Sequence, residues 1–245
     1  QKVRYIGYLD GKLAYPASEG DPACYQLHFI QLQGDIPNLY NINLKLQGEV
    51  MSVAAPTMDL RGENAAENYQ LLVGQGPIWV RCQSYVTFSS EKAICVAVKA
   101  ERYYGQNCRT MAVTSLIFNL ETGREYQIDD LFTMDRYRAL NLWNDLEYYS
   151  METEMREALG KDGFVEQFCT QKGRIGAFPI VFPDQVCLCF NYLYEVPEEG
   201  MEYRGNVYQY YPYSMFDRWP EELKGERNKS SGTCLLYTSP SPRDA

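Results

Sequence analysis

A change of hydrophobic period near Gly74 constrains the fold of this chain more than any other feature. From there on, apolar and polar positions alternate over 77–88, 93–104 and 110–120, and a short run over 125–128 follows. Residues that favour turns separate the runs: 89–92, 105–107 and 121–124. Consecutive strands joined by short turns predict an antiparallel meander.

The residues before Gly74 predict two strands and one helix. Strand-forming residues occupy 3–8 and 25–30, and Asp10-Gly11 favours a turn after the first of them. Pro37 stands where a helix can begin. Behind it, apolar residues recur at steps of three and four, at Leu39, Ile42, Leu46, Val50 and Val53. We therefore expect a helix over 38–53.

A long helix is predicted after the meander. Thr133 can cap its start, and Asp135 lies at the positive end of the helix dipole. The apolar pattern continues to Leu159, and Gly160 and Gly163 favour an end there.

Strands return in the last part of the chain. A hairpin around Pro183-Asp184 joins 176–182 to 185–193, and 207–211 forms a last strand. Sheets broken by one long helix favour an α+β class, with antiparallel meander sheets packed against helices.

We expect two subdomains of similar class, residues 1–128 and 129–220, followed by a polar, frayed tail over 221–233. The segment 234–245 resembles the translation of a sequencing adapter and is expected not to be native. The first residue, Gln1, is not Met, so a signal or anchor segment is expected upstream.

Charge and cysteine content exclude some functions. The 245 residues carry a formal net charge of −9, which argues against a nucleic-acid partner because phosphates require a basic surface. Seven cysteines precede residue 234 and form no C-x-x-C pair. An odd number is awkward for a disulfide framework, so buried free thiols are expected.

The residues that usually carry catalysis are sparse. His28 is the only histidine and lies in an apolar strand, where a packed imidazole is the expected role. There is no phosphate-binding glycine motif and no set of zinc ligands at workable spacing. Asp130 is expected to cap a turn or helix, not to act as an acid or base. We therefore predict no enzyme activity, no cofactor and no metal.

Tyrosines give the strongest indication of a binding site. They are dense between 192 and 213, and alternation places Tyr208 and Tyr210 on one strand face and Tyr211 on another. One face can be core while the other presents rings to a sugar or protein. The alternative is tyrosine-rich packing with hydroxyls at the rim. The candidate ligand-binding residues are Tyr192, Tyr194, Glu195, Tyr208, Tyr210 and Tyr213.

Two stretches resemble a known bacterial family. The segment 118–125 with Ile128-Asp129-Asp130-Leu131-Phe132, and the segment 190–196 with Tyr211-Pro212-Tyr213-Ser214, are similar to the paired domains of unknown function 3298 and 4163. The resemblance spans roughly 5–216, with 1–128 similar to 4163 and 129–220 similar to 3298. Where the family often has Gly-Gly-Ala-His, this chain has Gly105-Gln106-Asn107-Cys108.

These domains occur in the ectodomain of a lysozyme-sensing anti-sigma factor and ahead of the catalytic domain of a peptidoglycan deacetylase. The resemblance implies a non-catalytic, extracytoplasmic module of the bacterial envelope, held at the membrane only by an N-terminal anchor. A cationic protein such as lysozyme would suit the net charge of −9. The alternative is a peptidoglycan- or carbohydrate-binding accessory domain, and a carboxylate hydrolase is a third hypothesis.

Overall fold

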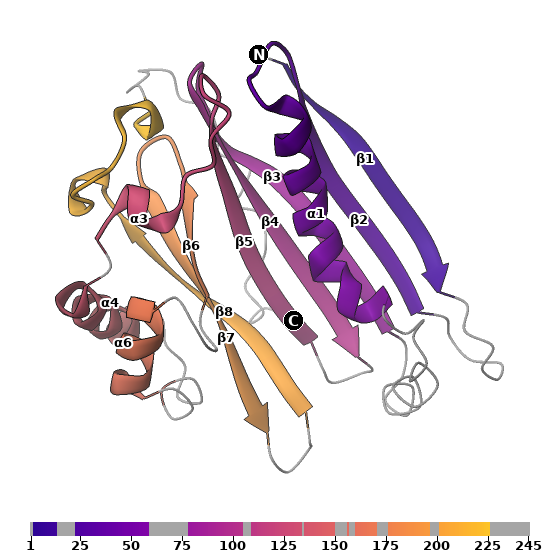
Figure 1. Ribbon diagram of the computed structural model, residues 1–245. Helices are drawn as coiled ribbons and strands as arrows, with labels where there is room; N and C mark the ends of the chain where they lie inside the picture. Colours follow the sequence, from indigo (N-terminus) through magenta and orange to yellow (C-terminus); the bar gives the residue numbers. More distant parts are fainter. Residues whose placement is uncertain are drawn as a thin grey trace.

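The computed structural model describes residues 2–13, 23–58, 78–104, 109–133, 135–149, 156, 160–170, 176–196 and 201–225. These residues form an α+β fold with two sheets, as the sequence predicts (Figure 1). The elements are β1 (Lys2–Leu13), β2 (Ala23–Gln33), α1 (Leu39–Met58), β3 (Ile78–Ser89), β4 (Ala93–Tyr104), β5 (Arg109–Asn119), α3 (Ile128–Leu131), α4 (Arg136–Tyr149), α6 (Lys161–Thr170), β6 (Gly176–Val181), β7 (Val186–Val196) and β8 (Met201–Tyr211).

The large sheet has the strand order β1-β2-β3-β4-β5. Strands β3, β4 and β5 pair antiparallel in sequence, which confirms the predicted meander. Strands β2 and β3 instead pair parallel, over Cys24–Leu27 and Trp79–Cys82. Parallel neighbours need a crossover connection, and α1 lies in the segment that joins them. Sequence periodicity does not report this pairing.

Helix α1 covers one face of the large sheet (Figure 1). Its side chains Ile42, Leu46 and Val50 are at most 1% exposed and pack on apolar residues of β2, β3 and β4. The helix predicted over 38–53 is therefore confirmed, and it continues to Met58.

Two predicted details of the first half are wrong. Asp10-Gly11 does not turn the chain, because β1 runs through it and its pairing with β2 is continuous there. The expected strand over 125–128 is reduced to one bridge between Phe118 and Glu125, and α3 then begins. The turn predicted over 105–107 lies outside the described residues.

The small sheet has the order β6-β7-β8, all antiparallel, and the hairpin at Pro183-Asp184 is confirmed. Leu188 and Phe190 of β7 pack on α4 and α6, whereas Cys187 and Cys189 face Ala97 of the large sheet. The molecule is thus layered as α1, large sheet, small sheet and the pair α4 with α6.

The predicted long helix is wrong in two respects. It begins later, at Arg136, where Asp135 Oδ1 accepts the N–H of Arg138 at 2.7 Å, while the Thr133 hydroxyl donates to Asp217 instead. Gly160 has a φ of +62°, as a helix end requires, but Gly163 lies inside a further helix, α6. Three buried apolar residues hold α6 on the core: Phe164, Val165 and Phe168.

One hydrophobic cluster joins the two halves of the chain. It combines Phe88 and Ile117 of the large sheet with α4, α6 and the small sheet. Trp219 and Leu223 also belong to it, so the expected frayed tail is wrong for residues 221–225, whereas 226–233 lie outside the described residues. The division at residue 128 stays a prediction, and this cluster lies across it.

Polar contacts fix the small sheet against the outer strand of the large one. Asn191 of β7 accepts the backbone N–H of Val113 at 2.9 Å and donates to its carbonyl at 2.6 Å. The Ser115 hydroxyl donates to the Pro179 carbonyl at 2.7 Å. Asn191 thereby acts as a short substitute for a neighbouring strand at the β5 edge.

No helix within the described ranges combines the length and the apolar character that crossing a membrane requires.

Candidate functional site

The strand β8 divides its tyrosines between core and surface, as alternation predicts. Tyr208 and Tyr210 are 36% and 48% exposed, whereas Tyr211 is 6% exposed. The Tyr211 hydroxyl donates to Asp145 Oδ2 at 3.1 Å, and burial together with that carboxylate raises its pKa. Tyr211 therefore serves packing, whereas the rings of Tyr208 and Tyr210 are partly exposed.

We define the aromatic edge as Phe182, Tyr208 and Tyr210. The rings of Phe182 and Tyr210 lie 6.3 Å apart. Tyr208 and Tyr210 stand opposite Cys189 and Cys187 in the β7–β8 pair, and these two cysteines face the large sheet. The aromatic edge therefore lies on the side of the small sheet that faces the large one.

A charged group of the large sheet lies beside this edge. Burial raises the pKa of Tyr208 above its ordinary value, and the charges of its neighbours, Glu101 of β4 among them, add to the shift. The Asn191–Val113 hydrogen bonds agree with this neighbourhood, because Val113 pairs with Lys99, two residues from Glu101 in β4.

Tyr213 does not belong to the aromatic edge. Its hydroxyl donates to the Phe182 carbonyl, and its ring stacks on Trp219 at a centroid distance of 5.5 Å. Burial raises the pKa of Tyr213 to about 12. This tyrosine therefore follows the packing alternative that the sequence left open.

The remaining candidates lie on β7. The backbones of Tyr192, Tyr194 and Glu195 pair with Gly205, Tyr203 and Glu202 of β8. Their side chains lie outside the described residues, so their role in binding stays a prediction.

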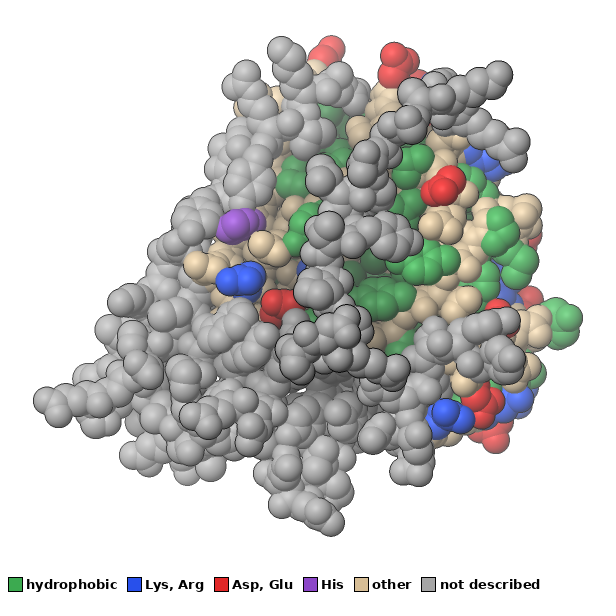
Figure 2. Space-filling model, turned by 180° about the vertical axis from the view of Figure 1, so that it is seen from behind, with side chains coloured by type: hydrophobic (Ala, Val, Ile, Leu, Met, Phe, Trp, Pro, Cys, Tyr) green, Lys and Arg blue, Asp and Glu red, His purple; other side chains and the backbone are tan. Residues whose placement is uncertain are grey.

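The large sheet carries polar side chains on the face away from α1. We define the polar face as Gln26, His28, Arg81, Gln83, Lys99 and Glu101. In β3 and β4 these residues alternate with buried Val80, Cys82, Val98 and Ala100 of the α1 side. In the view from behind, the histidine lies beside Lys or Arg and Asp or Glu side chains (Figure 2).

The strand register aligns the polar face in rows. Gln26, Arg81 and Glu101 are successive partners across β2, β3 and β4, and Gln83 pairs with Lys99 in the next row. Adjacent strands are about 4.8 Å apart, so the first row spans roughly 10 Å. At Ala97 of β4 the small sheet covers this face, because Cys187 and Cys189 pack on Ala97 there.

Specific contacts hold these side chains in place. The Arg81 Nε–H donates to Gln26 Oε1 at 3.3 Å, and Lys99 Nζ forms an ion pair with Glu101 Oε1 at 2.9 Å. The Tyr85 hydroxyl donates to Gln83 Oε1 at 2.5 Å. Sequence reasoning missed the polar face, although Arg81 and Gln83 in β3, and Lys99 and Glu101 in β4, are polar at alternate positions between buried apolar residues.

Most of the described cysteines lie in the core. Cys82, Cys95, Cys187 and Cys189 are buried thiols outside any disulfide, as predicted, whereas Cys169 is only partly buried. Burial raises the pKa of the Cys95 thiol to about 11 and that of Cys187 to about 12, which disfavours the reactive thiolate. Within the described ranges, no three His, Cys, Asp or Glu residues gather as metal ligands would.

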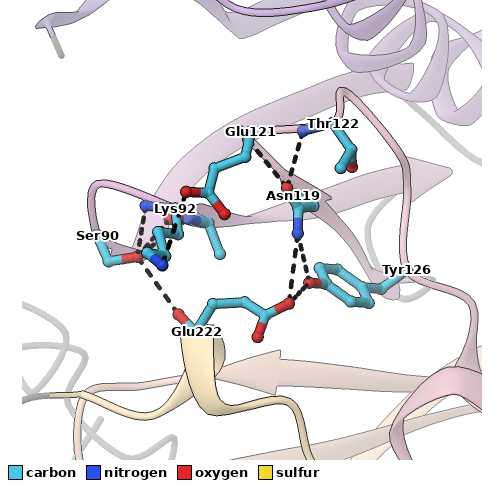
Figure 3. A network of polar contacts seen from close by, with 8 residues as sticks. Ser90, Lys92, Asn119, Glu121, Thr122, Tyr126 and Glu222 are labelled. Atoms are coloured by element: carbon cyan, nitrogen blue, oxygen red, sulfur yellow. Dashed lines mark hydrogen bonds and ion pairs between the residues drawn. The ribbon is translucent and has the colours of Figure 1, made fainter.

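A second polar cluster lies at the turns of the large sheet (Figure 3). Glu222 Oε1 accepts from the Tyr126 hydroxyl and, at 3.3 Å, from Asn119 Nδ2. The Ser90 hydroxyl donates to the Glu222 carbonyl at 3.4 Å, and Lys92 forms an ion pair with Glu121 at 3.6 Å. These contacts hold the C-terminal segment against two turns. We therefore interpret this cluster as stabilising the fold, not as a binding site.

Comparisons with known proteins concern the fold. No family model matches the sequence, and no curated protein matches it. A DUF3298 family protein of Bacteroides fragilis has a TM-score of 0.50 and 14% identity, covering 87% of this chain and 91% of that one. A DUF3298 family protein of Pseudomonas aeruginosa has a TM-score of 0.47 and 12% identity, and the match covers 93% of this chain and 99% of that one. The chain thus shares the fold of the Bacteroides protein; its likeness to domain 4163, to the anti-sigma factor and to the deacetylase stays a prediction.

Proposed function

We propose that this chain is a non-catalytic binding module of an extracytoplasmic bacterial protein. Its ligand in this proposal is a glycan strand of the cell wall, bound across the aromatic edge and the polar face. The partial exposure of Tyr208 and Tyr210, while their neighbour Tyr211 is buried, carries the proposal. The polar face lies next to their strand pair, because Asn191 of β7 hydrogen-bonds Val113, the β5 partner of Lys99. Sugar rings stack on exposed aromatic faces, and their hydroxyls need a nearby set of polar side chains.

The chemistry of the polar face favours binding over hydrolysis. Glycosidases protonate the leaving oxygen with a carboxylic acid. Glu101, the carboxylate described on this face, forms an ion pair with Lys99 and so is arranged to accept hydrogen bonds. Lys99, Arg81 and Gln26 supply donors to a ligand in a fixed geometry.

Titration with soluble wall-derived oligosaccharides tests the proposal. We expect the intrinsic fluorescence of tyrosine and tryptophan to change and Tyr210→Ala to weaken binding about tenfold, since an exposed ring contact is worth about 1–2 kcal/mol. Tyr137→Ala is the matched control, because Tyr137 is 76% exposed and lies on α4, away from the site. A flat response, or an equal effect of both substitutions, would refute the proposal.

The net charge of −9 favours a second candidate ligand, a cationic protein such as lysozyme. Calorimetric titration with lysozyme at low and high salt tests it. Binding that weakens with salt and is unchanged in Tyr210→Ala would support a protein ligand in place of a glycan. An absence of binding at low salt would exclude the lysozyme version.

A further inference from the structure

The described side chains of the polar face carry one more positive than negative charge. Its described charged groups are Arg81, Lys99 and Glu101, two cations and one carboxylate. The chain as a whole has a net charge of −9. Among the described side chains of this face the cations outnumber the carboxylates, which favours a negative group on the bound ligand.

The arrangement of these charges leaves the positive charge at the surface. The Glu101 side chain is 13% exposed and lies between two cations: Lys99 forms an ion pair with it, and Arg81 is its direct partner across the β3–β4 pair. Arg81 itself is exposed. Glu101 is therefore less exposed than Arg81, its partner in the same row.

Arg81 is also oriented for recognition. Gln26 Oε1, on the neighbouring strand, accepts its Nε–H at 3.3 Å, which restricts rotation of the guanidinium plane. A planar guanidinium matches the geometry of a carboxylate better than an ammonium group does. Asn191 of β7 hydrogen-bonds Val113, whose partner in β4 is Lys99, and Cys189, two residues before Asn191, pairs with Tyr208. The strand pair that carries Tyr208 therefore meets the large sheet next to the row of Lys99, two residues from the row of Arg81 and Glu101.

We infer that Arg81, oriented by Gln26 and set beside the Lys99–Glu101 pair, binds a carboxylate carried by the ligand that stacks on Tyr208 and Tyr210. This inference rests on the proposed glycan-binding function and narrows it to acidic glycans. Arg81 is then the residue that gives the protein a higher affinity for acidic oligosaccharides than for neutral ones of equal length.

The test uses a carboxylate-bearing oligosaccharide and the same oligosaccharide with its carboxylates reduced to alcohols. Calorimetry on the full chain measures both dissociation constants for the wild type, Arg81→Gln and Arg81→Lys. We expect the wild type to bind the acidic form about tenfold more tightly, Arg81→Gln to lose that preference, and Arg81→Lys to keep part of it. Lys92→Gln, a surface lysine paired with Glu121, is the control and should keep the full preference.

The outcomes distinguish this inference from the proposed function. Equal affinity of the wild type for both forms, or an equal loss of both in Arg81→Gln, would overturn the role of Arg81 and leave glycan binding intact. If neither form binds, the proposed function fails and the inference fails with it. A thermal melt of Arg81→Gln that matches the wild type confirms that the variant is folded.

Discussion

At the scale of single residues, one carboxylate holds the C-terminal segment in place. Glu222 accepts hydrogen bonds from Tyr126 and Asn119, and the pKa of Glu222 is lowered chiefly by the Tyr126 hydroxyl. Burial, with the nearby carboxylate, raises the pKa of Tyr126 to about 12. Both shifts favour an ionised carboxylate facing a neutral phenol.

These shifts predict an acid-sensitive contribution to stability. A carboxylate whose folded-state pKa lies below its ordinary value of 4.5 stabilises the fold above that pH, and the stabilisation is lost as pH falls through the folded-state pKa. We expect Glu222→Gln to cost about 1–2 kcal/mol at pH 7 and to flatten the decline below pH 4.5. Urea unfolding between pH 3 and 7 measures both effects.

The neighbouring Glu221 offers the control. It lies in the same turn and pairs only at the surface, with Lys224, so Glu221→Gln should change the unfolding free energy by less than about 0.5 kcal/mol. A Glu222→Gln variant with the pH profile of the wild type would contradict the assignment.

At the scale of elements, two glycines have opposite roles. Gly48 lies in the interior of α1, where an added Cβ would have nothing within 4 Å. Gly123 has a φ of +70°, and an added Cβ would lie 2.1 Å from the carbonyl oxygen of Pro37, so the turn before α3 needs glycine to approach the start of α1.

This contrast gives a paired prediction. We expect Gly48→Ala to stabilise the protein by about 0.5–1 kcal/mol, because alanine favours a helix interior. Gly123→Ala should destabilise it by about 2 kcal/mol or more, because both the backbone angle and the contact with Pro37 must change. Chemical denaturation of the two variants checks the signs, and shifts of the same sign would refute the argument.

Strands were easier to predict than helices for a physical reason. In β4 and β7, alternation and turn residues are local signals, and both elements appear where they were expected. The start of α4 depends on a distant residue, because Asp217 takes the Thr133 hydroxyl and Asp135 caps the helix instead. Gly163 favoured a helix end, yet the burial of Phe164 and Phe168 outweighs its low helix propensity.

At the scale of the whole molecule, the shared core predicts cooperative unfolding. The main hydrophobic cluster joins residues on both sides of position 128, and Asn191 hydrogen-bonds the small sheet to β5. We expect one calorimetric transition whose measured enthalpy equals the van't Hoff enthalpy. Two separate transitions would indicate two independent subdomains instead.

The sequence by itself determined the α+β class, the β3–β5 meander, the β6–β7 hairpin and the separation of Tyr208 and Tyr210 from Tyr211 on opposite strand faces, since each follows from local alternation or turn chemistry. Only the tertiary structure decided the parallel β2–β3 pair and the burial of Leu223. It also decided which polar residues of the large sheet lie near the tyrosines of the small sheet. These features depend on contacts between residues far apart in the chain, and the side-chain pattern of one strand carries no information about its neighbours.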